Sequence, residues 1–329
     1  MRPLILKGHE RALTKVKYNR EGDLLFSAAK DKSPCVWFSD NGERLGTYDG
    51  HNGVVWCLDV TWDSRKLITG SGDNACLLWD VETGKQLVKL QSPTSVRTVG
   101  FSFSGTLMFF GTDQRATKEC SLMVYDQRDQ SQLSTGEPLL NIPTNKSKAT
   151  SALWSHLDDY IVTGHENGEI CQFDVRTRSL EPVNFVHEHK RTIMDLQKSA
   201  DNVALISASK DHTAKLFDAK TLQHLKTYQS ERPVNSAAIS PIRDHIVLGG
   251  GEEAMSVTQT GAQQGQFESK IYHLVFEDEF ARLKGHFGPI NSLAFHPDGR
   301  SYASGGEDGI VRIQNFDGED EYFNFDFDF

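Results

Sequence analysis

The chain has 329 residues, 38% of them hydrophobic and 24% charged, with a formal net charge of −10 at pH 7 and a pI near 5.6. This is an ordinary globular composition, and the acidic balance argues against a protein that covers nucleic-acid phosphates with clustered Lys and Arg. No segment approaches the roughly 18 consecutive apolar residues of a membrane helix, so we expect no membrane association. The five cysteines are scattered and never spaced as CxxC, which favours reduced thiols over a disulfide or metal framework.

A repeated unit is the main signal along the chain. Gly-His pairs occur at Gly8-His9, Gly50-His51 and Gly285-His286, and short apolar strands run into small-residue turns that end in an acid or Asn. These turn residues are Asp31, Asp73, Asp113, Asn167, Asp211, Glu253 and Asp308. Their spacing fits repeats of about 40–45 residues with four strands each, and two longer intervals indicate insertions near residues 114–121, 132–148 and 257–270. Seven such repeats cover almost the whole chain and predict an all-β, seven-bladed β-propeller.

An aromatic residue follows the turn by six positions in the best repeats, as Trp37 follows Asp31 and Trp79 follows Asp73. These residues resemble the WD-repeat family, in which the His, a Ser or Thr, the turn Asp and the Trp form one hydrogen-bonded chain within a blade. The matching complete sets are His9, Ser27, Asp31, Trp37 and His51, Thr69, Asp73, Trp79. Two incomplete sets are His189, Ser207, Asp211 with Phe217, and His286, Ser304, Asp308 with Gln314. A turn Asp accepts bonds from local backbone and from the ring, so few buried polar atoms stay unpaired.

The combination of His, hydroxyl and Asp also suggests a nucleophilic triad. The set recurs in several blades, whereas an active site occurs once, and no G-x-S-x-G elbow is present. Gly249, Gly250 and Gly251 follow a strand as in a phosphate loop, but the acids after them would repel phosphate. His187 and His189 have no further ligands at zinc spacing. The sequence therefore predicts no catalytic, cofactor or metal site, and a propeller enzyme or small-ligand binder remains the alternative to a protein-binding platform.

The two chain termini are expected to meet in the last blade. Residues 3–6 precede the first Gly-His pair as residues 44–48 and 281–283 precede the others, which predicts an outer strand beside the strands at 300–316. Such closure removes an exposed sheet edge. We expect one propeller domain over 1–329 with a short Phe-rich acidic tail at about 318–329. Phe alternates with polar residues in this tail, which either packs on its own propeller or docks on a partner.

Several acids fall in turns that share one face of the propeller. Turns between successive strands alternate between the two faces, so the turns with Asp201 and Asp218 meet on one face of the fifth blade. Asp158, Asp159 and Asp174 fall on the same face of the fourth blade. An acidic surface can attract a basic partner segment and steer its association. Ordinary solvated turn acids are the alternative interpretation.

Several stretches exceed what WD repeats share among themselves: residues 8–11, 18–26, 41–47, 231–237, 248–251, 284–292 and 304–309. They are similar to the i-subunit family of eukaryotic translation initiation factor three, with less similarity over about 114–190. The resemblance implies a cytoplasmic, non-catalytic scaffold subunit without cofactor, which binds a carboxy-terminal segment of the b subunit and also the g subunit. It implies support for recruitment of initiator tRNA and mRNA and for scanning on the small ribosomal subunit, without sequence-specific nucleic-acid contact. The family's b-subunit contact matches Asp201 and Asp218 here.

Overall fold

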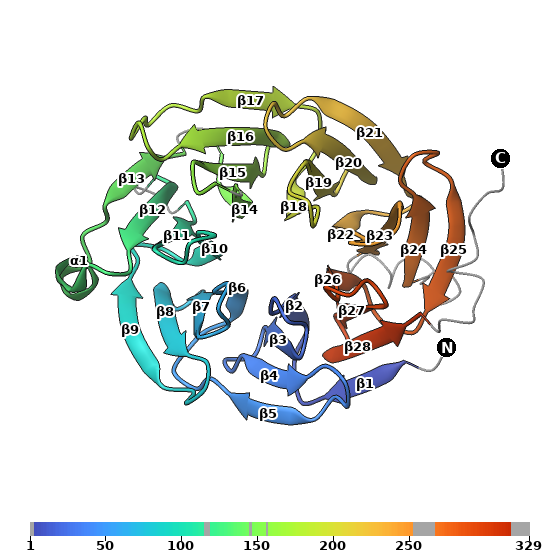
Figure 1. Ribbon diagram of the computed structural model, residues 1–329, viewed down its shortest axis with the longest axis horizontal. Helices are drawn as coiled ribbons and strands as arrows, with labels where there is room; N and C mark the ends of the chain where they lie inside the picture. Colours follow the sequence, from blue (N-terminus) through green and yellow to red (C-terminus); the bar gives the residue numbers. More distant parts are fainter. Residues whose placement is uncertain (1–2, 115–118, 145–146, 156, 253–266, 317–329) are drawn as a thin grey trace.

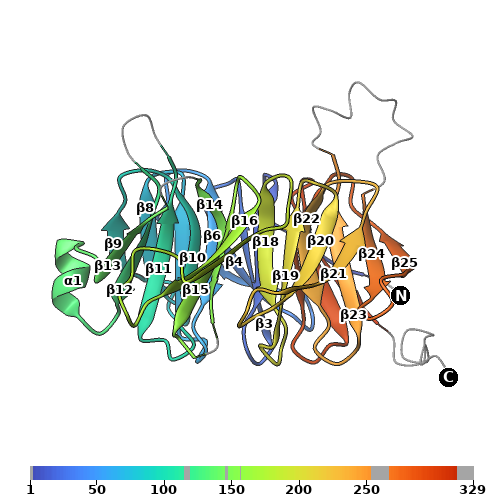
Figure 2. The same cartoon turned by 90° about the horizontal axis from the view of Figure 1, so that it is seen from above.

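Seven four-stranded antiparallel sheets stand as blades around a central axis (Figure 1). Seen from the side they form a flat disc whose connections lie on two opposite faces (Figure 2). This computed structural model describes residues 3–114, 119–144, 147–155, 157–252 and 267–316. The prediction of an all-β, seven-bladed propeller is confirmed. The expected tail at 318–329 and the turn residue Glu253 lie outside the described residues.

The blades follow one another in chain order, each with its first strand innermost. Blade 1 contains β2 (Leu13–Tyr18), β3 (Leu24–Ala29), β4 (Cys35–Phe38) and β5 (Arg44–Thr47). Blade 2 contains β6 (Val55–Val60), β7 (Lys66–Ser71), β8 (Ala75–Asp80) and β9 (Gln86–Gln91). Blade 3 contains β10 (Val96–Phe101), β11 (Leu107–Thr112), β12 (Ser121–Asp126) and β13 (Leu140–Pro143). Blade 4 contains β14 (Ala149–Trp154), β15 (Tyr160–His165), β16 (Glu169–Asp174) and β17 (Asn184–His187).

The last three blades repeat this order, with one exception at the ring closure. Blade 5 contains β18 (Ile193–Lys198), β19 (Ala204–Ser209), β20 (Thr213–Asp218) and β21 (His224–Gln229). Blade 6 contains β22 (Val234–Ile239), β23 (His245–Gly250), β24 (Glu268–His273) and β25 (Glu279–Lys284). Blade 7 contains β26 (Ile290–Phe295), β27 (Ser301–Gly306), β28 (Ile310–Asn315) and, from the amino terminus, β1 (Leu4–Lys7).

Strand β1 closes the ring, as the sequence predicted. It pairs antiparallel with β28, with Leu4 opposite Ile313 and Lys7 opposite Ile310. Both elements lie side by side at the edge of blade 7 (Figure 1). Because the amino-terminal strand completes the carboxy-terminal blade, separating the two ends of the ring requires breaking this ladder.

The small residues before each turn are explained by the packing of neighbouring blades. A Cβ added to Gly70 of β7 would lie 2.5 Å from a methyl carbon of Val96 in the next blade. At Gly305 of β27 it would lie 2.9 Å from the Cβ of Leu13, across the ring closure. Each blade therefore needs a small side chain where the next innermost strand approaches, and close packing leaves no room for a larger one.

The innermost strands also share an irregularity in register just after their first residue. At this position Thr14 donates a hydrogen bond to the carbonyl of Val55 in blade 2, at 2.7 Å. Asn235 donates to Ile290 of blade 7 at 3.0 Å, and Asn291 donates to Leu13 of blade 1 at 2.9 Å. The bulge turns these side chains sideways, so that adjacent blades are joined near the axis.

The insertion predicted in blade 3 contains a helix, α1 (Gln130–Thr135), between β12 and β13. Asp129 caps its amino terminus by accepting from the backbone N–H of Ser131 and Gln132. Gly136 ends it with a φ of 75°, a left-handed conformation that suits glycine. Leu133 is buried against blades 2 and 3, so the insertion covers the outer edge of the ring (Figure 1).

Candidate functional site

The face of the propeller that carries His51 and Asp73 contains the hydrogen-bonded sets expected from the repeats; we call it the network face. In blade 2 the Nδ1 atom of His51 lies 3.0 Å from the Asp73 carboxylate, and its Nε2 atom lies 2.8 Å from Thr69 Oγ1. The indole N–H of Trp79 donates to the same hydroxyl at 2.8 Å. In the arrangement that satisfies every atom, the ring donates to Asp73 and accepts the hydroxyl proton. One chain of bonds thus links an outer strand to the turn.

Blade 1 has the same complete chain. His9 lies 2.7 Å from both the Asp31 carboxylate and Ser27 Oγ, and the Trp37 indole donates to Ser27 at 2.8 Å. The two incomplete sets lack only the indole bond. In blade 5 His189 joins Asp211 and Ser207 at 2.9 and 2.6 Å, and in blade 7 His286 joins Asp308 and Ser304 at 3.1 and 2.8 Å.

Three carboxylates of these sets, those of Asp73, Asp211 and Asp308, are held in their ionised form. Burial by itself would raise the pKa of Asp73, but the hydrogen bonds from the Asn52 amide and from His51 bring it below its ordinary value. The same balance of burial against hydrogen bonds lowers the pKa of Asp211 and of Asp308. Burial lowers the pKa of His51, with Asp73 opposing the shift, so that the ring is neutral at pH 7.

The chemistry of a nucleophilic triad needs a hydroxyl that substrate can reach. The side-chain oxygens of Ser27, Thr69 and Ser207 belong to fully buried residues, with 0% exposure. Two of these hydroxyls are also occupied by an indole donor. The arrangement holds strands to turns and offers no nucleophile at a surface.

Blades 3 and 4 satisfy the equivalent region differently. In blade 3 Asp113 accepts from the Arg97 guanidinium at 2.8 Å instead of from a His. In blade 4 the Nε2 atom of His165 lies 2.7 Å from Thr163 Oγ1, and its Nδ1 atom lies 3.0 Å from the carbonyl of Ser147. His165 was missed by the sequence reasoning, because it is the last residue of the second strand, β15, rather than part of a Gly-His pair. The signal was present as a His directly before the turn of a repeat that lacks the pair.

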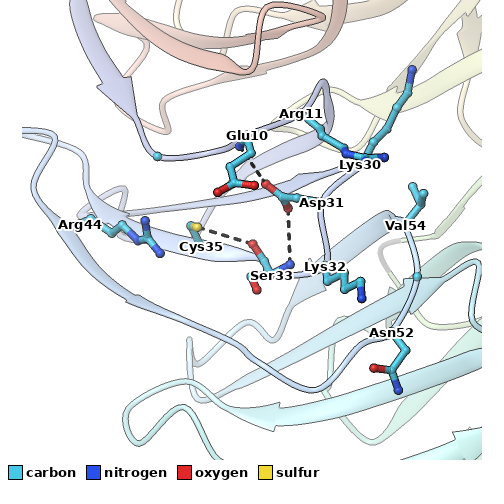
Figure 3. A pocket seen from close by; sticks show the side chains of 12 residues that line it. Glu10, Arg11, Lys30, Asp31, Lys32, Ser33, Cys35, Arg44, Asn52 and Val54 are labelled. Atoms are coloured by element: carbon cyan, nitrogen blue, oxygen red, sulfur yellow. Dashed lines mark hydrogen bonds between the residues drawn. The ribbon is translucent and has the colours of Figure 1, made fainter.

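A cleft of about 610 Å³ opens on the network face between blades 1 and 2 (Figure 3). Its charged lining includes Arg11, Lys30, Lys32 and Arg44, together with acids. Burial raises the pKa of Cys35, in the cleft wall, to about 12, so the thiol is protonated and unreactive at pH 7. The chain thus has a concave surface here without a catalytic set.

Two pairs of charged side chains on the innermost strands, near the axis where a propeller enzyme would place its site, are engaged with each other. Lys15 of blade 1 reaches the Asp195 carboxylate of blade 5 at 2.6 Å, and Asp195 also accepts from the hydroxyl of Ser236. Lys17 pairs with Asp59, which accepts from the backbone N–H of Phe101 in the next blade. The first pair links blades across the ring, and the second links neighbouring blades. Within the described ranges, no group of three or more His, Cys, Asp or Glu side chains is placed to hold a metal ion.

The opposite face, which we call the acidic face, carries the turns after the first and third strands of each blade. Eight acids and four cations occupy the seven first-to-second-strand turns. The acids are Glu21, Asp23, Asp63, Asp158, Asp159, Asp201, Asp244 and Asp298, and the cations are Arg20, Arg65, Arg243 and Arg300. The excess of acids gives this face a negative potential that attracts basic segments.

The two partner-binding candidates, Asp201 and Asp218, occupy turns on the acidic face of blade 5. Asp201 accepts from the Ser199 hydroxyl and from the backbone N–H of Val203 at 3.1 Å. Asp218 accepts from the backbone N–H and the hydroxyl of Thr221 at 2.7 and 2.8 Å. These hydrogen bonds lower the pKa of both carboxyls. Neither carboxylate has an ion pair within the described part of the chain, so both charges stay available.

The acids on the same face of blade 4 differ from this pair. Asp159 and Asp174 both lie near the guanidinium of Arg176, at 3.2 and 3.5 Å. Asp158 accepts from the backbone N–H groups of Phe103 and Ser104 in blade 3. The acids of blade 4 therefore pair with a cation or bind the neighbouring blade, whereas among the described residues the two carboxylates of blade 5 have neither kind of contact.

Blade 2 repeats the hydrogen bonds that the two carboxylates of blade 5 accept. Asp63 accepts from the Thr61 hydroxyl and the Arg65 amide, as Asp201 does from its own turn. Asp80 accepts from the amide and hydroxyl of Thr83 at 2.7 and 2.8 Å, as Asp218 does from Thr221. Each of the four carboxylates therefore stabilises its own turn, and blade 2 provides a structural match for blade 5 on another side of the ring.

Comparison with known proteins places the chain in one family. The family model EIF3I matches residues 1–328. The chain belongs to the EIF3I family. Proteins named eukaryotic translation initiation factor 3 subunit I from Taeniopygia guttata and Homo sapiens are each 56% identical over 328 residues, covering all of this chain and all of the relative. The protein of that name from Danio rerio is 56% identical over 326 residues, 99% of each chain.

Membership in the EIF3I family confirms the resemblance found in the sequence. The expectation of a propeller-type translation initiation factor is confirmed at this level by the family and by the fold. Among the residues that the structure describes, no helix is long and apolar enough to cross a membrane.

Proposed function

We propose that the chain is a non-catalytic scaffold subunit of eukaryotic translation initiation factor three, acting in the cytoplasm. Its propeller binds a carboxy-terminal segment of the b subunit and also the g subunit. Through the assembled factor it supports recruitment of initiator tRNA and mRNA and scanning on the small ribosomal subunit. The sets around His9, His51, His189 and His286 serve as internal supports of the blades in this proposal.

The observation that carries the proposal is the pair of unneutralised carboxylates on blade 5. Asp201 is exposed, and Asp218 is partly exposed on the same face. Their lowered pKa values keep both ionised well below neutral pH. A basic partner segment laid across this face gains attraction from both charges without displacing a cation of the same chain.

The matched turns of blade 2 make a controlled test possible. The double substitution Asp201→Lys with Asp218→Lys reverses the charge of blade 5 and removes two turn-stabilising carboxylates. The double substitution Asp63→Lys with Asp80→Lys does the same in blade 2, so both variants share the structural cost. Capture of the purified b-subunit segment is expected to fall by roughly tenfold or more for the blade 5 variant and to stay near wild type for the blade 2 variant.

Two experimental outcomes would contradict the proposal. Unchanged capture by the folded blade 5 variant would remove the docking site, and equal loss in both variants would show a general effect of charge or turn stability. Capture measured at two salt concentrations should weaken at the higher one, because exposed charges are screened. Recovery of the other factor subunits by pull-down from cell extract, without turnover by the purified chain, would support the scaffold role over the enzyme alternative.

A further inference from the structure

Three long side chains from successive blades lie in a row on the acidic face. The guanidinium carbon of Arg20 in blade 1 sits 4.3 Å from the ring centroid of Trp62 in blade 2. The Trp62 ring in turn lies 4.5 Å from the ring of Phe103 in blade 3, tilted by 52°. Trp62 is 46% exposed. These three residues form what we call the aromatic row.

The repeat itself does not require these side chains. Each occupies the second position of the turn after the innermost strand, in the five-residue turns 19–23, 61–65 and 102–106. At the same position blade 5 has Ala200, and blades 6 and 7 have Pro241 and Pro297. The turn therefore forms with a small or cyclic residue at this position, and its conformation does not explain the large planar groups of blades 1 to 3.

The row is held in place from both ends. Asn19 donates a side-chain hydrogen bond to the Ser64 hydroxyl at 3.1 Å, which ties the turns of blades 1 and 2. The Ser64 hydroxyl donates to Glu21 at 3.1 Å. At the other end Asp158 of blade 4 accepts from the amide of Ser104, at 2.9 Å. A rigid exposed Trp binds with little loss of conformational entropy on contact, which is typical of residues that dominate binding energy.

The charges around the row decide between possible ligands. Glu21 accepts a hydrogen bond from Ser64 in the Trp62 turn. Asp63 lies 3.9 Å from Arg65 in that turn. Over the seven first-to-second-strand turns the acids outnumber the cations. The phosphates of a nucleic acid would be repelled there, although a base could stack on Trp62. A peptide with Arg or Lys instead lays its apolar stem on the ring and its charge beside the acids.

We propose that the aromatic row is a second docking surface, which binds a basic peptide segment of a partner in the assembled factor. The segment packs an Arg or Lys side chain on the exposed part of Trp62, with Glu21 facing its charge. This surface lies in blades 1 to 3, whereas Asp201 and Asp218 lie in blade 5. The proposal rests on the chain working within a larger assembly, and it stands or falls independently of the b-subunit contact at blade 5.

The test uses the whole factor, reconstituted with this chain carrying photoreactive benzoylphenylalanine in place of Arg65. The Arg65 side chain is 84% exposed and sits in the same turn as Trp62. Mass spectrometry should identify a crosslinked segment of another subunit with an excess of Lys and Arg. Adding Trp62→Ala should lower the crosslink yield by roughly tenfold. Trp62→Phe, which retains a planar ring, should restore most of it.

Leu87→Ala is the matched control, because Leu87 lies on the outer strand of the same blade and is 48% exposed. It should leave the crosslink unchanged. An undiminished yield with Trp62→Ala, or a crosslink to an acidic segment, would overturn the proposal. A fluorescently labelled 25-nucleotide single-stranded RNA tests the other ligand class. Binding of that RNA to the isolated chain that is lost with Trp62→Ala would also overturn it, in favour of an RNA contact.

Discussion

Blades 2 and 3 are neighbours with the same strand order, yet they stabilise the turn after their second strand by different means. In blade 2 the Asp73 carboxylate accepts from His51 and from the backbone amides of Asn52 and Ala75. In blade 3 Asp113 pairs with Arg97, whose guanidinium also lies 4.2 Å from the Trp56 ring. The sheet itself needs only its apolar packing and its ladders. The polar set is one of several ways to satisfy the hydrogen-bonding groups of the turn, and its contribution to stability depends on how deeply it is buried.

The largest expected effect comes from removing the turn carboxylate of blade 2, compared with the same change in blade 3. Asp73→Ala leaves a buried His51 ring nitrogen and two amides without their acceptor, and should cost about 3 kcal/mol of stability. Asp113→Ala breaks a partly exposed ion pair and should cost about 1 kcal/mol or less. Thermal melting of the two variants checks the ranking. Equal melting-temperature shifts would contradict the distinction between the blades.

Acidification should weaken the blade 2 set through its two titrating groups. Hydrogen bonds lower the pKa of Asp73 against the effect of burial, so its contribution is complete above the unfolded pKa of about 3.9 and is lost as the pH falls through the folded value. Burial lowers the pKa of His51 below about 6.5, so its contribution is likewise present at higher pH and lost on acidification. The melting temperature should fall from pH 7 to pH 3.5 by a larger amount in wild type than in His51→Gln, which lacks the titrating ring and its bond to Asp73. Parallel pH profiles would show that the set does not titrate as described.

A smaller effect is expected from the outer end of the set. Trp79→Phe removes the indole bond to Thr69 and should cost about 1 kcal/mol. Blade 5 already has Phe217 at this position, fully buried beside a His189 set that keeps its other bonds. A chemical denaturation curve would measure the loss. A cost as large as that of Asp73→Ala would mean that the indole, and not the carboxylate, holds the turn.

The smallest effect concerns thiol reactivity and leaves stability unchanged. Burial raises the pKa of Cys57 in blade 2 to about 12 and that of Cys76 well above its ordinary value. It also raises the pKa of Cys120 in blade 3, but this thiol lies outside the strands, directly before β12. Iodoacetamide labelling of the folded chain, followed by mass spectrometry, should modify Cys120 before the other two. Earlier labelling of Cys57 or Cys76 would place the looser packing in blade 2.

Much of the fold could be predicted from the sequence because its signals are local to one repeat. The His and Asp of each set are 22 residues apart, as in His51 and Asp73, and the repeat fixes this spacing wherever it occurs. The same periodicity predicted seven blades and the pairing of β1 with the last blade. It also placed Asp201 and Asp218 on one face, since connections in an antiparallel sheet alternate between its two ends.

Only the tertiary structure decided what happens between repeats and in the irregular ones. Arg20 and Trp62 are 42 positions apart, and their contact depends on how two blades are set side by side around the ring. In blade 4, which lacks a Gly-His pair, His165 makes the bonds to the Thr163 hydroxyl and the Ser147 carbonyl, and these depend on the orientation of its ring. Repeat periodicity determines contacts inside a blade, because their spacing is constant. Contacts between blades combine side chains that differ from one repeat to the next, so their geometry depends on how the blades are arranged around the ring.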